Sequence, residues 1–240
     1  MSQNNNISGE TNIPTQDLVS DYLLQGTPSD TLIVFAHGAG ANMHHEFMAQ
    51  MAQKLVAAQF QVLRFNFLYM QANMADGKRR PPDRAPKLLA HYESVLEKID
   101  SLKQEGKVHY HRIVLVGKSM GGRMSAILMS DEHQIENDVA KLVQKEVSHV
   151  ICLGYPFLPP KGKEPRLSPL NQSQMPILIL QGERDTFGNR EQLPQWSIRH
   201  GVEIKWIGDG DHSFKPRKKS GFDFEGNLDV AVNYITEYLN

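Results

Sequence analysis

The sequence predicts a single α/β domain with a doubly wound, mostly parallel β-sheet. Short, continuously apolar runs alternate along the chain with longer segments whose apolar residues recur at helical spacing. Continuously apolar strands are typical of sheets that helices cover on both faces. The length of 240 residues suits one such domain, and the sequence shows neither an internal repeat nor an interdomain linker. We expect a flexible tail over residues 1–16 and the domain over residues 17–240.

Each element is assigned from the period of its apolar residues. Strands are assigned to runs rich in Val, Ile and Leu that are too short for helices, and helices to apolar residues spaced three and four apart. The expected elements are, in chain order, a strand at 31–36, a helix at 47–56, a strand at 61–66, a loop at about 68–86, a helix at 88–102, a strand at 112–116, a helix after residue 119, strands at 147–153, 176–181 and 202–207, and a closing helix at 228–239. This alternation predicts parallel strands joined by helical crossovers.

Composition and charge exclude several classes of function. The formal net charge of -1 provides no overall field that would favour nucleic acid or an anionic membrane. The single cysteine, Cys152, lies in an apolar run and is expected to be a core residue. Zinc-type cysteine spacing is absent, and the adjacent His44 and His45 are poorly placed for joint ligation, so no metal is expected. Without a signal-peptide pattern or a long apolar stretch, we expect a soluble cytoplasmic protein with neither a nucleic-acid nor a membrane partner.

The segment Gly117-Lys118-Ser119-Met120-Gly121 matches the pattern G-x-S-x-G between an expected strand and an expected helix. In this context the serine lies on a tight turn with its hydroxyl above the sheet, and the two glycines remove side chains that would clash. The pattern alone is common, but the strand before it and the helix after it are the context that the motif requires. Ser119 is therefore a candidate nucleophile, with a structural serine in a glycine-rich turn as the alternative.

A serine hydroxyl becomes a good nucleophile only when a base removes its proton. Asp185 and His212 follow Ser119 in the order acid, then base, and each lies just after an expected strand. Because the carboxyl ends of parallel strands meet at one edge of the sheet, we expect the three side chains to converge. Glu183 is an alternative acid. His37 is the best alternative base, although its place before a glycine turn fits a role in shaping that loop.

Two aspartates near His212, Asp209 and Asp211, are expected to be solvated turn residues. The oxyanion of a tetrahedral intermediate needs hydrogen-bond donors, for which the backbone N–H groups of Met120 and Ala39 are the candidates. Gly38 or Gly40 could replace Ala39 in this role. The glycines of this loop also permit a tight turn, and the two roles are compatible.

Several of these segments occur together in a known group of proteins. They resemble the small dienelactone-hydrolase-like proteins of the α/β-hydrolase superfamily that are related to testis-expressed protein thirty and to the third subunit of the nonspecific-lethal complex. The resemblance covers about residues 30–240 and implies an α/β-hydrolase fold with little or no lid domain. It assigns the triad roles to Ser119, Asp185 and His212 but supplies no substrate. The segments that carry it are 37–40, 117–123, 154–156, 181–185 and 210–212.

The motifs and the resemblance together predict a serine hydrolase that cleaves an ester or related acyl bond of a small molecule without a cofactor. The alternative is a non-catalytic binding or scaffold protein with the same fold that acts through a partner. The sequence does not predict an oligomeric state. Tyr155 and Phe157 follow a strand end and are candidates for lining an acyl pocket, or else for packing a loop against the sheet.

Basic residues near the expected site suggest a further hypothesis about the substrate. Lys118 and Arg123 flank the nucleophile, and an anionic group such as a carboxylate or phosphate would explain the basic loops. Lys118, Arg79 and Arg80 are the candidate contacts. Solvated loops that balance acidic surface are the simpler explanation. The basic residues of the loops are Lys78, Arg79, Arg80 and Arg84, then Lys161, Lys163 and Arg166, and finally Lys215, Arg217, Lys218 and Lys219.

Overall fold

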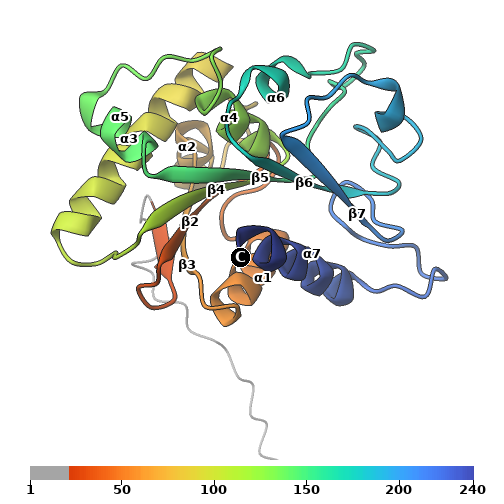
Figure 1. Cartoon of the computed structure of the whole chain (residues 1–240), viewed down its shortest axis with the longest axis horizontal. Coiled ribbons are helices and arrows are strands. Elements are labelled where there is room, and N and C mark those ends of the chain that lie inside the picture. Colours follow the sequence, from red (N-terminus) through yellow and green to blue (C-terminus); the bar gives the residue numbers. More distant parts are fainter. Residues whose placement is uncertain (1–21) are drawn as a thin grey trace, which may run out of the picture.

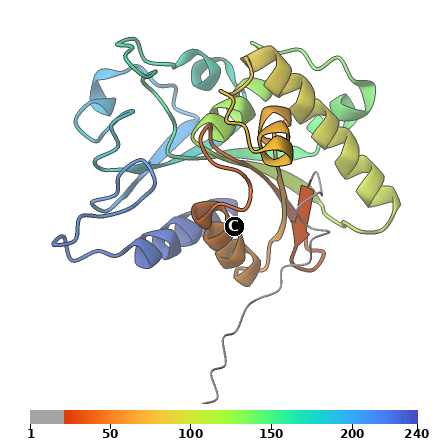
Figure 2. The ribbon, with the colours of Figure 1, turned by 180° about the vertical axis from the view of Figure 1, so that it is seen from behind.

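A computed structural model describes residues 22–240 of the chain, so the tail expected over residues 1–16 lies outside the described residues. Figure 1 shows one twisted sheet between two layers of helices, as the alternation of strands and helices predicts. Figure 2 shows the same two layers from behind. No helix in this part of the chain is both long and apolar enough to cross a membrane.

The sheet has seven strands in the order β1-β3-β2-β4-β5-β6-β7. Only β1 runs antiparallel to its neighbour, so the prediction of a doubly wound, mostly parallel sheet is confirmed. The chain moves outward from β2 to β3 and then returns to β4 on the other side of β2, and binding sites form where the order reverses in this way. The strands are β1 (Tyr22–Gln25), β2 (Thr31–Ala36), β3 (Gln61–Phe65), β4 (Arg112–Lys118), β5 (Val147–Leu153), β6 (Ile177–Gly182) and β7 (Val202–Ile207).

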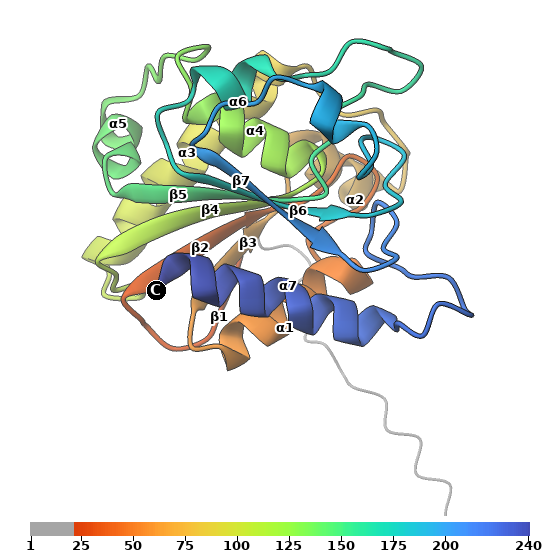
Figure 3. The ribbon, with the colours of Figure 1, turned by 45° about the vertical axis from the view of Figure 1, so that its right-hand side comes forward.

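Helices cover both faces of the sheet, as Figure 3 shows. Two helices, α1 (Glu46–Ala57) and α7 (Phe224–Leu239), lie side by side on one face. The helices on the other face are α2 (Leu68–Asp76), α3 (Ala85–Gln104), α4 (Met120–Leu128), α5 (Asp138–Gln144) and α6 (Ser168–Gln172). Because both faces are covered, the inner strands β2, β3 and β6 are buried over their whole length, whereas the edge strands β1 and β7 are partly exposed.

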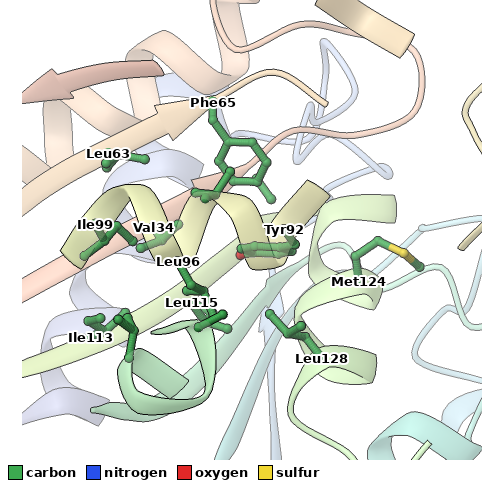
Figure 4. Packing of buried hydrophobic residues seen from close by; sticks show 14 of the residues in the cluster. Val34, Leu63, Phe65, Tyr92, Leu96, Ile99, Ile113, Leu115, Met124 and Leu128 are labelled. Carbon is green, nitrogen blue, oxygen red and sulfur yellow. The ribbon is translucent and has the colours of Figure 1, made fainter. Parts of the chain in front are cut away.

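The side chains of β2 illustrate this double burial. Successive residues of a strand point to opposite faces. Ile33 and Phe35 pack with the residues of α1 and α7, whereas Leu32 and Val34 pack with those of α3 and α4, and all four are fully buried. Figure 4 shows Val34 in the second of these clusters together with Tyr92, Leu96 and Ile99 of α3. Cys152 is likewise buried in β5, as expected, and burial raises the pKa of its thiol.

The prediction of a loop at 68–86 is wrong over its first half, because Leu68–Asp76 forms α2. This helix buries only Tyr69 and Met70, so its sequence carries too short an apolar stripe to indicate a helix. It ends at Gly77, whose φ of 70° is the left-handed conformation common after the last turn of a helix. The edge strand β1 and the helix α5 were not expected either, since each is short.

Candidate active site

Ser119 lies on the turn between β4 and α4, with φ 50° and ψ -112°. A non-glycine residue adopts such a conformation only where the surrounding structure enforces it. Here a Cβ on Gly117 would lie 2.1 Å from the backbone nitrogen of Gly122, and one on Gly121 would lie 2.4 Å from the carbonyl oxygen of Ala36. The two glycines of the motif are therefore required by backbone contacts, and they bring the start of α4 against the end of β2.

The three candidate triad residues converge at the carboxyl ends of their strands. Nε2 of His212 lies 2.8 Å from Oγ of Ser119, and Nδ1 of His212 lies 2.8 Å from Oδ2 of Asp185. Asp185 follows β6 and is fully buried, whereas His212 follows β7 and is partly exposed. These distances are those of a nucleophile bonded to a base that a buried acid orients.

Asp185 receives two further hydrogen bonds that hold its carboxylate in place. The backbone N–H of Phe187 donates to Oδ1 at 2.8 Å, and Nε2 of Gln181 donates to Oδ2 at 2.8 Å. Gln181 is itself fully buried and pairs with the backbone of Tyr155 through its Oε1. Sequence reasoning missed this residue, although a glutamine that ends the apolar strand β6 is the kind of signal that could have identified it.

The pKa of His212 is lowered, chiefly because its imidazole is buried. The hydrogen bond to Asp185 raises this pKa, and the positive charge of Lys118 lowers it further. The Phe187 ring lies 4.6 Å from the imidazole and covers it. A neutral imidazole with an orienting carboxylate on Nδ1 can accept the Ser119 proton on Nε2.

Lys118, a candidate substrate contact, lines the pocket at Ser119 but is largely buried. Its Nζ donates to the backbone carbonyl of His212 at 2.6 Å. Burial lowers the pKa of Lys118 to about 8, while the charges of Asp185 and Asp211 act in the opposite direction. Lys118 therefore links the nucleophile turn to the backbone of the histidine and holds that loop in place.

The loop that follows β2 is held by His37 and Tyr69. Nε2 of His37 accepts from the backbone N–H of Phe67 at 3.0 Å, so the proton of the neutral ring lies on Nδ1, which bonds the Gly38 carbonyl at 2.7 Å. The Tyr69 hydroxyl donates to the Ala39 carbonyl at 3.0 Å. The Gly38 carbonyl and the Ala39 N–H belong to one peptide, and in a trans peptide the two groups point in opposite directions. Because the carbonyl bonds His37, the Ala39 N–H points away from His37. His37 thus shapes this loop and is too deeply buried to replace His212 as the base.

Two pockets border Ser119. The first has a volume of about 330 Å³ and contains His212 in its wall. The second has a volume of about 290 Å³ and contains Met120, which opens α4 with an N–H that has no acceptor within the helix. Ala39 and Ser119 line both, so the two candidate oxyanion donors lie beside the nucleophile. The remaining residues of the first pocket are Gly38, Gly40, Ala41, His45, Phe47, Met48, Lys118, Phe187 and Ser213.

The alternative acid Glu183 does not contact His212. Its carboxylate instead pairs with Arg190 at 2.5 Å and accepts the backbone N–H of Asp209 at 2.9 Å. Asp209 was expected to be solvated, and this is wrong: it is 6% exposed and bonds Arg217 at 2.8 Å. The ion pairs of this aspartate anchor the turn that carries the histidine, so its burial has a clear physical reason.

Two other candidates lie away from Ser119. Tyr155 and Phe157 are fully buried in the core beneath α6 and line neither pocket, so of the two alternatives the structure agrees with packing of a loop against the sheet and not with lining an acyl pocket. The Tyr155 hydroxyl is used internally, since it donates to the carbonyl of Arg166 at 2.9 Å.

Arg79 and Arg80 lie in the loop after α2, where they border an open pocket shared with Ala39. That pocket does not include Ser119. Arg80 pairs with Asp76 at 2.8 Å, whereas Arg79 is exposed. Among residues 22–240 no cluster of His, Cys, Asp or Glu could hold a metal ion.

Fold and site together define an α/β hydrolase. The sequence matches the family described as Alpha/beta hydrolase domain over residues 29–240, and the chain belongs to this family. No curated protein matches the sequence.

The chain is similar to several solved structures. One is an α/β serine hydrolase homologue from Coxiella burnetii, with 19% identity, a TM-score of 0.62 and 91% of each chain covered. A second is a serine hydrolase without a lid from Xanthomonas campestris, with 16% identity, a TM-score of 0.58 and coverage of 89% of this chain and 88% of that chain. A third is esterase 2 from Thermogutta terrifontis phosphorylated by paraoxon, with 16% identity, a TM-score of 0.62 and coverage of 90% of this chain and 88% of that chain. At sequence identities this low, the structural similarity establishes the fold alone.

The contact between Gly121 and Ala36 gives a test of the turn. A methyl group in Gly121→Ala would lie 2.4 Å from a backbone oxygen, so the helix start must shift. We expect the free energy of unfolding to fall by about 1–3 kcal/mol in denaturant titrations. Gly40→Ala is the matched control, because a Cβ there meets nothing within 4 Å, and its effect should stay within about 0.5 kcal/mol. Equal stability of the two variants would contradict this account.

His37 makes stability depend on pH. Burial lowers its pKa from 6.5 to about 4, so protonation favours the unfolded chain. The stability that neutral His37 contributes is complete above pH 6.5 and is lost as the pH falls toward 4, by about 3 kcal/mol at most. His37→Gln, which cannot titrate, should show a smaller loss of unfolding free energy across this range. The same loss in both proteins would show that His37 is not the group responsible.

Proposed function

We propose that the protein is a serine hydrolase that cleaves an ester or related acyl bond through Ser119, His212 and Asp185. The single observation that carries this proposal is the unbroken chain of hydrogen bonds from Ser119 Oγ through His212 to the buried Asp185. The narrower relationship to the dienelactone-hydrolase-like proteins belongs to the same proposal and rests on the five segments of the sequence that resemble them.

The proposed reaction follows from the positions of these groups. As Ser119 Oγ attacks the substrate carbonyl carbon, His212 Nε2 takes its proton, and the backbone N–H groups of Met120 and Ala39 stabilise the oxyanion. His212 then gives the proton to the leaving alcohol, which departs as the carbonyl re-forms. Water attacks the acyl-enzyme with His212 again as the base and releases the acid. Asp185 keeps the imidazole in the required tautomer and stabilises its charged form.

Labelling with a fluorophosphonate probe tests the proposal on the purified protein. Such a probe phosphonylates a serine only when a base and an oxyanion site activate it, so wild type should label rapidly. Ser119→Ala should not label, and His212→Ala should label at least about 10³-fold more slowly. Mass spectrometry of the digested protein identifies the modified peptide by the mass that the probe adds to it.

Ser213→Ala is the control for this experiment, because Ser213 borders the same pocket but its backbone N–H bonds Asp211, and neither imidazole nitrogen bonds its hydroxyl. It should label like wild type. If folded wild type fails to label, the proposal of catalysis is wrong, and a scaffold role for the same fold becomes the better account.

Lys118 gives a pH-dependent test of the base. Its positive charge lowers the pKa of His212, which burial already lowers below 6.5. Labelling should therefore reach its plateau below the pH expected for an ordinary histidine and decline as the pH falls through the lowered pKa. In Lys118→Met this decline should move to higher pH.

The readout is the rate of labelling against pH. Lys215→Met is the matched control, since Lys215 lies on the histidine loop but is exposed, and solvent screens its charge. Slower labelling of Lys118→Met with an unchanged pH profile would show that Lys118 acts on the loop alone and not through its charge.

A further inference from the structure

The second pocket beside Ser119 contains two guanidinium groups. Its volume of about 290 Å³ is enough for a short acyl chain but not for a large one. Arg123 and Arg166 come from α4 and from the loop after β5. The other residues of its wall are Ala39, Pro82, Asp83, Ala85, Leu88, Met120, Met124, Pro156, Pro160 and Phe187.

Arg123 follows Ser119 by four residues, so the two lie about one helical turn, or about 6 Å, apart along α4. Its backbone N–H bonds the Ser119 carbonyl at 3.1 Å, which fixes this spacing. Its Nε is buried and has no hydrogen-bond partner. Within residues 22–240 its guanidinium forms no ion pair, so an anion in this pocket would meet a positive charge that no carboxylate of the described chain balances.

The backbone of Arg166 is held firmly while its guanidinium is left nearly unused. Its N–H bonds the Phe157 carbonyl at 2.7 Å and its carbonyl accepts the Tyr155 hydroxyl at 2.9 Å. The guanidinium has one long contact, from Nη1 to the carbonyl of Pro156 at 3.5 Å, and no ion pair in the described chain. Burial and the neighbouring charge of Arg123 lower the pKa of Arg166. Two like charges thus face one small space.

The wall also contains one carboxylate, Asp83. Its Oδ1 pairs with Lys87 at 2.9 Å, and its Oδ2 is buried without a hydrogen-bond partner. Because Lys87 already balances the charge of Asp83, the two guanidinium groups are the uncompensated charges of this wall. Two guanidinium groups that face one small space can bind a carboxylate between them.

The positions of the catalytic groups decide which half of a substrate enters this pocket. The leaving group must lie near His212, which protonates it, and His212 borders the first pocket only. The second pocket lies on the side of Met120, next to the proposed oxyanion donor. The acyl chain, which stays bonded to Ser119 after the alcohol leaves, therefore extends into the second pocket.

We propose that this pocket takes an acyl chain that ends in a carboxylate, bound by Arg123 and Arg166, so that the substrates are half-esters of short dicarboxylic acids. This inference rests on the proposed function. The pocket volume of about 290 Å³ suits an acyl chain of about four to six carbons. The Ser119 oxygen bonds the acyl carbon, the ester C–O bond breaks, and the alcohol leaves with the proton from His212. Water then cleaves the acyl-enzyme to give the dicarboxylate and restores the serine.

The test compares two activated esters of equal acyl length, the mono-4-nitrophenyl ester of adipic acid and 4-nitrophenyl hexanoate. Rates measured with Ser119→Ala are subtracted as the uncatalysed background. Wild type should have the higher kcat/KM on the adipate half-ester. Arg123→Gln and Arg166→Gln should each lower that value by about 10- to 100-fold and change the value for hexanoate by less than about twofold.

Two control variants separate this pocket from charge elsewhere. Lys145→Gln removes one positive charge just before β5, at the opposite end of the sheet, and should leave both rates unchanged. Arg79→Gln tests the basic loop after α2 and should leave the preference for the half-ester unchanged. The proposal is overturned if wild type shows no such preference, if Arg79→Gln removes it, or if Arg123→Gln lowers both rates equally.

Binding of adipate to Ser119→Ala, measured by calorimetry, separates the two proposals. Adipate should bind this variant, and the additional change Arg123→Gln should weaken binding at least about tenfold. Binding with no hydrolysis of either ester by wild type would support the anion subsite and overturn the proposed function. Hydrolysis of hexanoate without adipate binding would support the hydrolase and overturn the subsite.

Discussion

The active end of this molecule depends on one close backbone contact, between the start of α4 and the end of β2. It can form only because Gly121 has no side chain next to the carbonyl of Ala36. The contact holds Ser119 in its strained conformation, and a bond from the Ser119 N–H to the Leu153 carbonyl at 3.0 Å ties the same turn to β5. It also sets the loop that carries Ala39 against the helix that begins at Met120. Backbone contacts therefore fix the position of Ser119 relative to both candidate oxyanion donors.

The charges of Asp185 and Lys118, together with burial, keep the His212 imidazole neutral. Asp185 is buried and receives hydrogen bonds from three groups, so its negative charge is stabilised without a direct cationic partner. Lys118 supplies a buried positive charge one residue before Ser119 and bonds the backbone of His212. The aspartate favours the charged imidazole, whereas the lysine and burial disfavour it. A neutral imidazole that is free to gain a proton from Ser119 fits the proposed role of His212 as the base.

Sequence reasoning predicted the parts of the fold and site that local pattern determines. The order of strands and helices, the turn at Ser119 and the strand ends that carry Asp185 and His212 follow from apolar periodicity and glycine placement. The helix α2 was missed because it buries only two side chains. Gln181 was missed because its role depends on the position of Asp185 across a turn, and the burial of Asp209 depends on arginines that approach from other segments. Such tertiary partners leave no periodic signal in the sequence.

Tertiary partners also decide which basic residues are available to bind a substrate, and the sequence does not show these partners. From the sequence, Arg80 is a candidate substrate contact, whereas Arg123 is only a basic residue that flanks Ser119. In the structure, Arg80 is paired with Asp76 near the surface, where an ion pair is worth little and needs no ligand. Arg123 is instead partly buried, has no ion pair with any residue of the described chain and shares a pocket with Arg166, an arrangement that favours an anion between them. We therefore expect a substrate anion to bind where the fold leaves a partly buried arginine without an ion pair in the described chain. The density of basic residues along the sequence does not indicate this position.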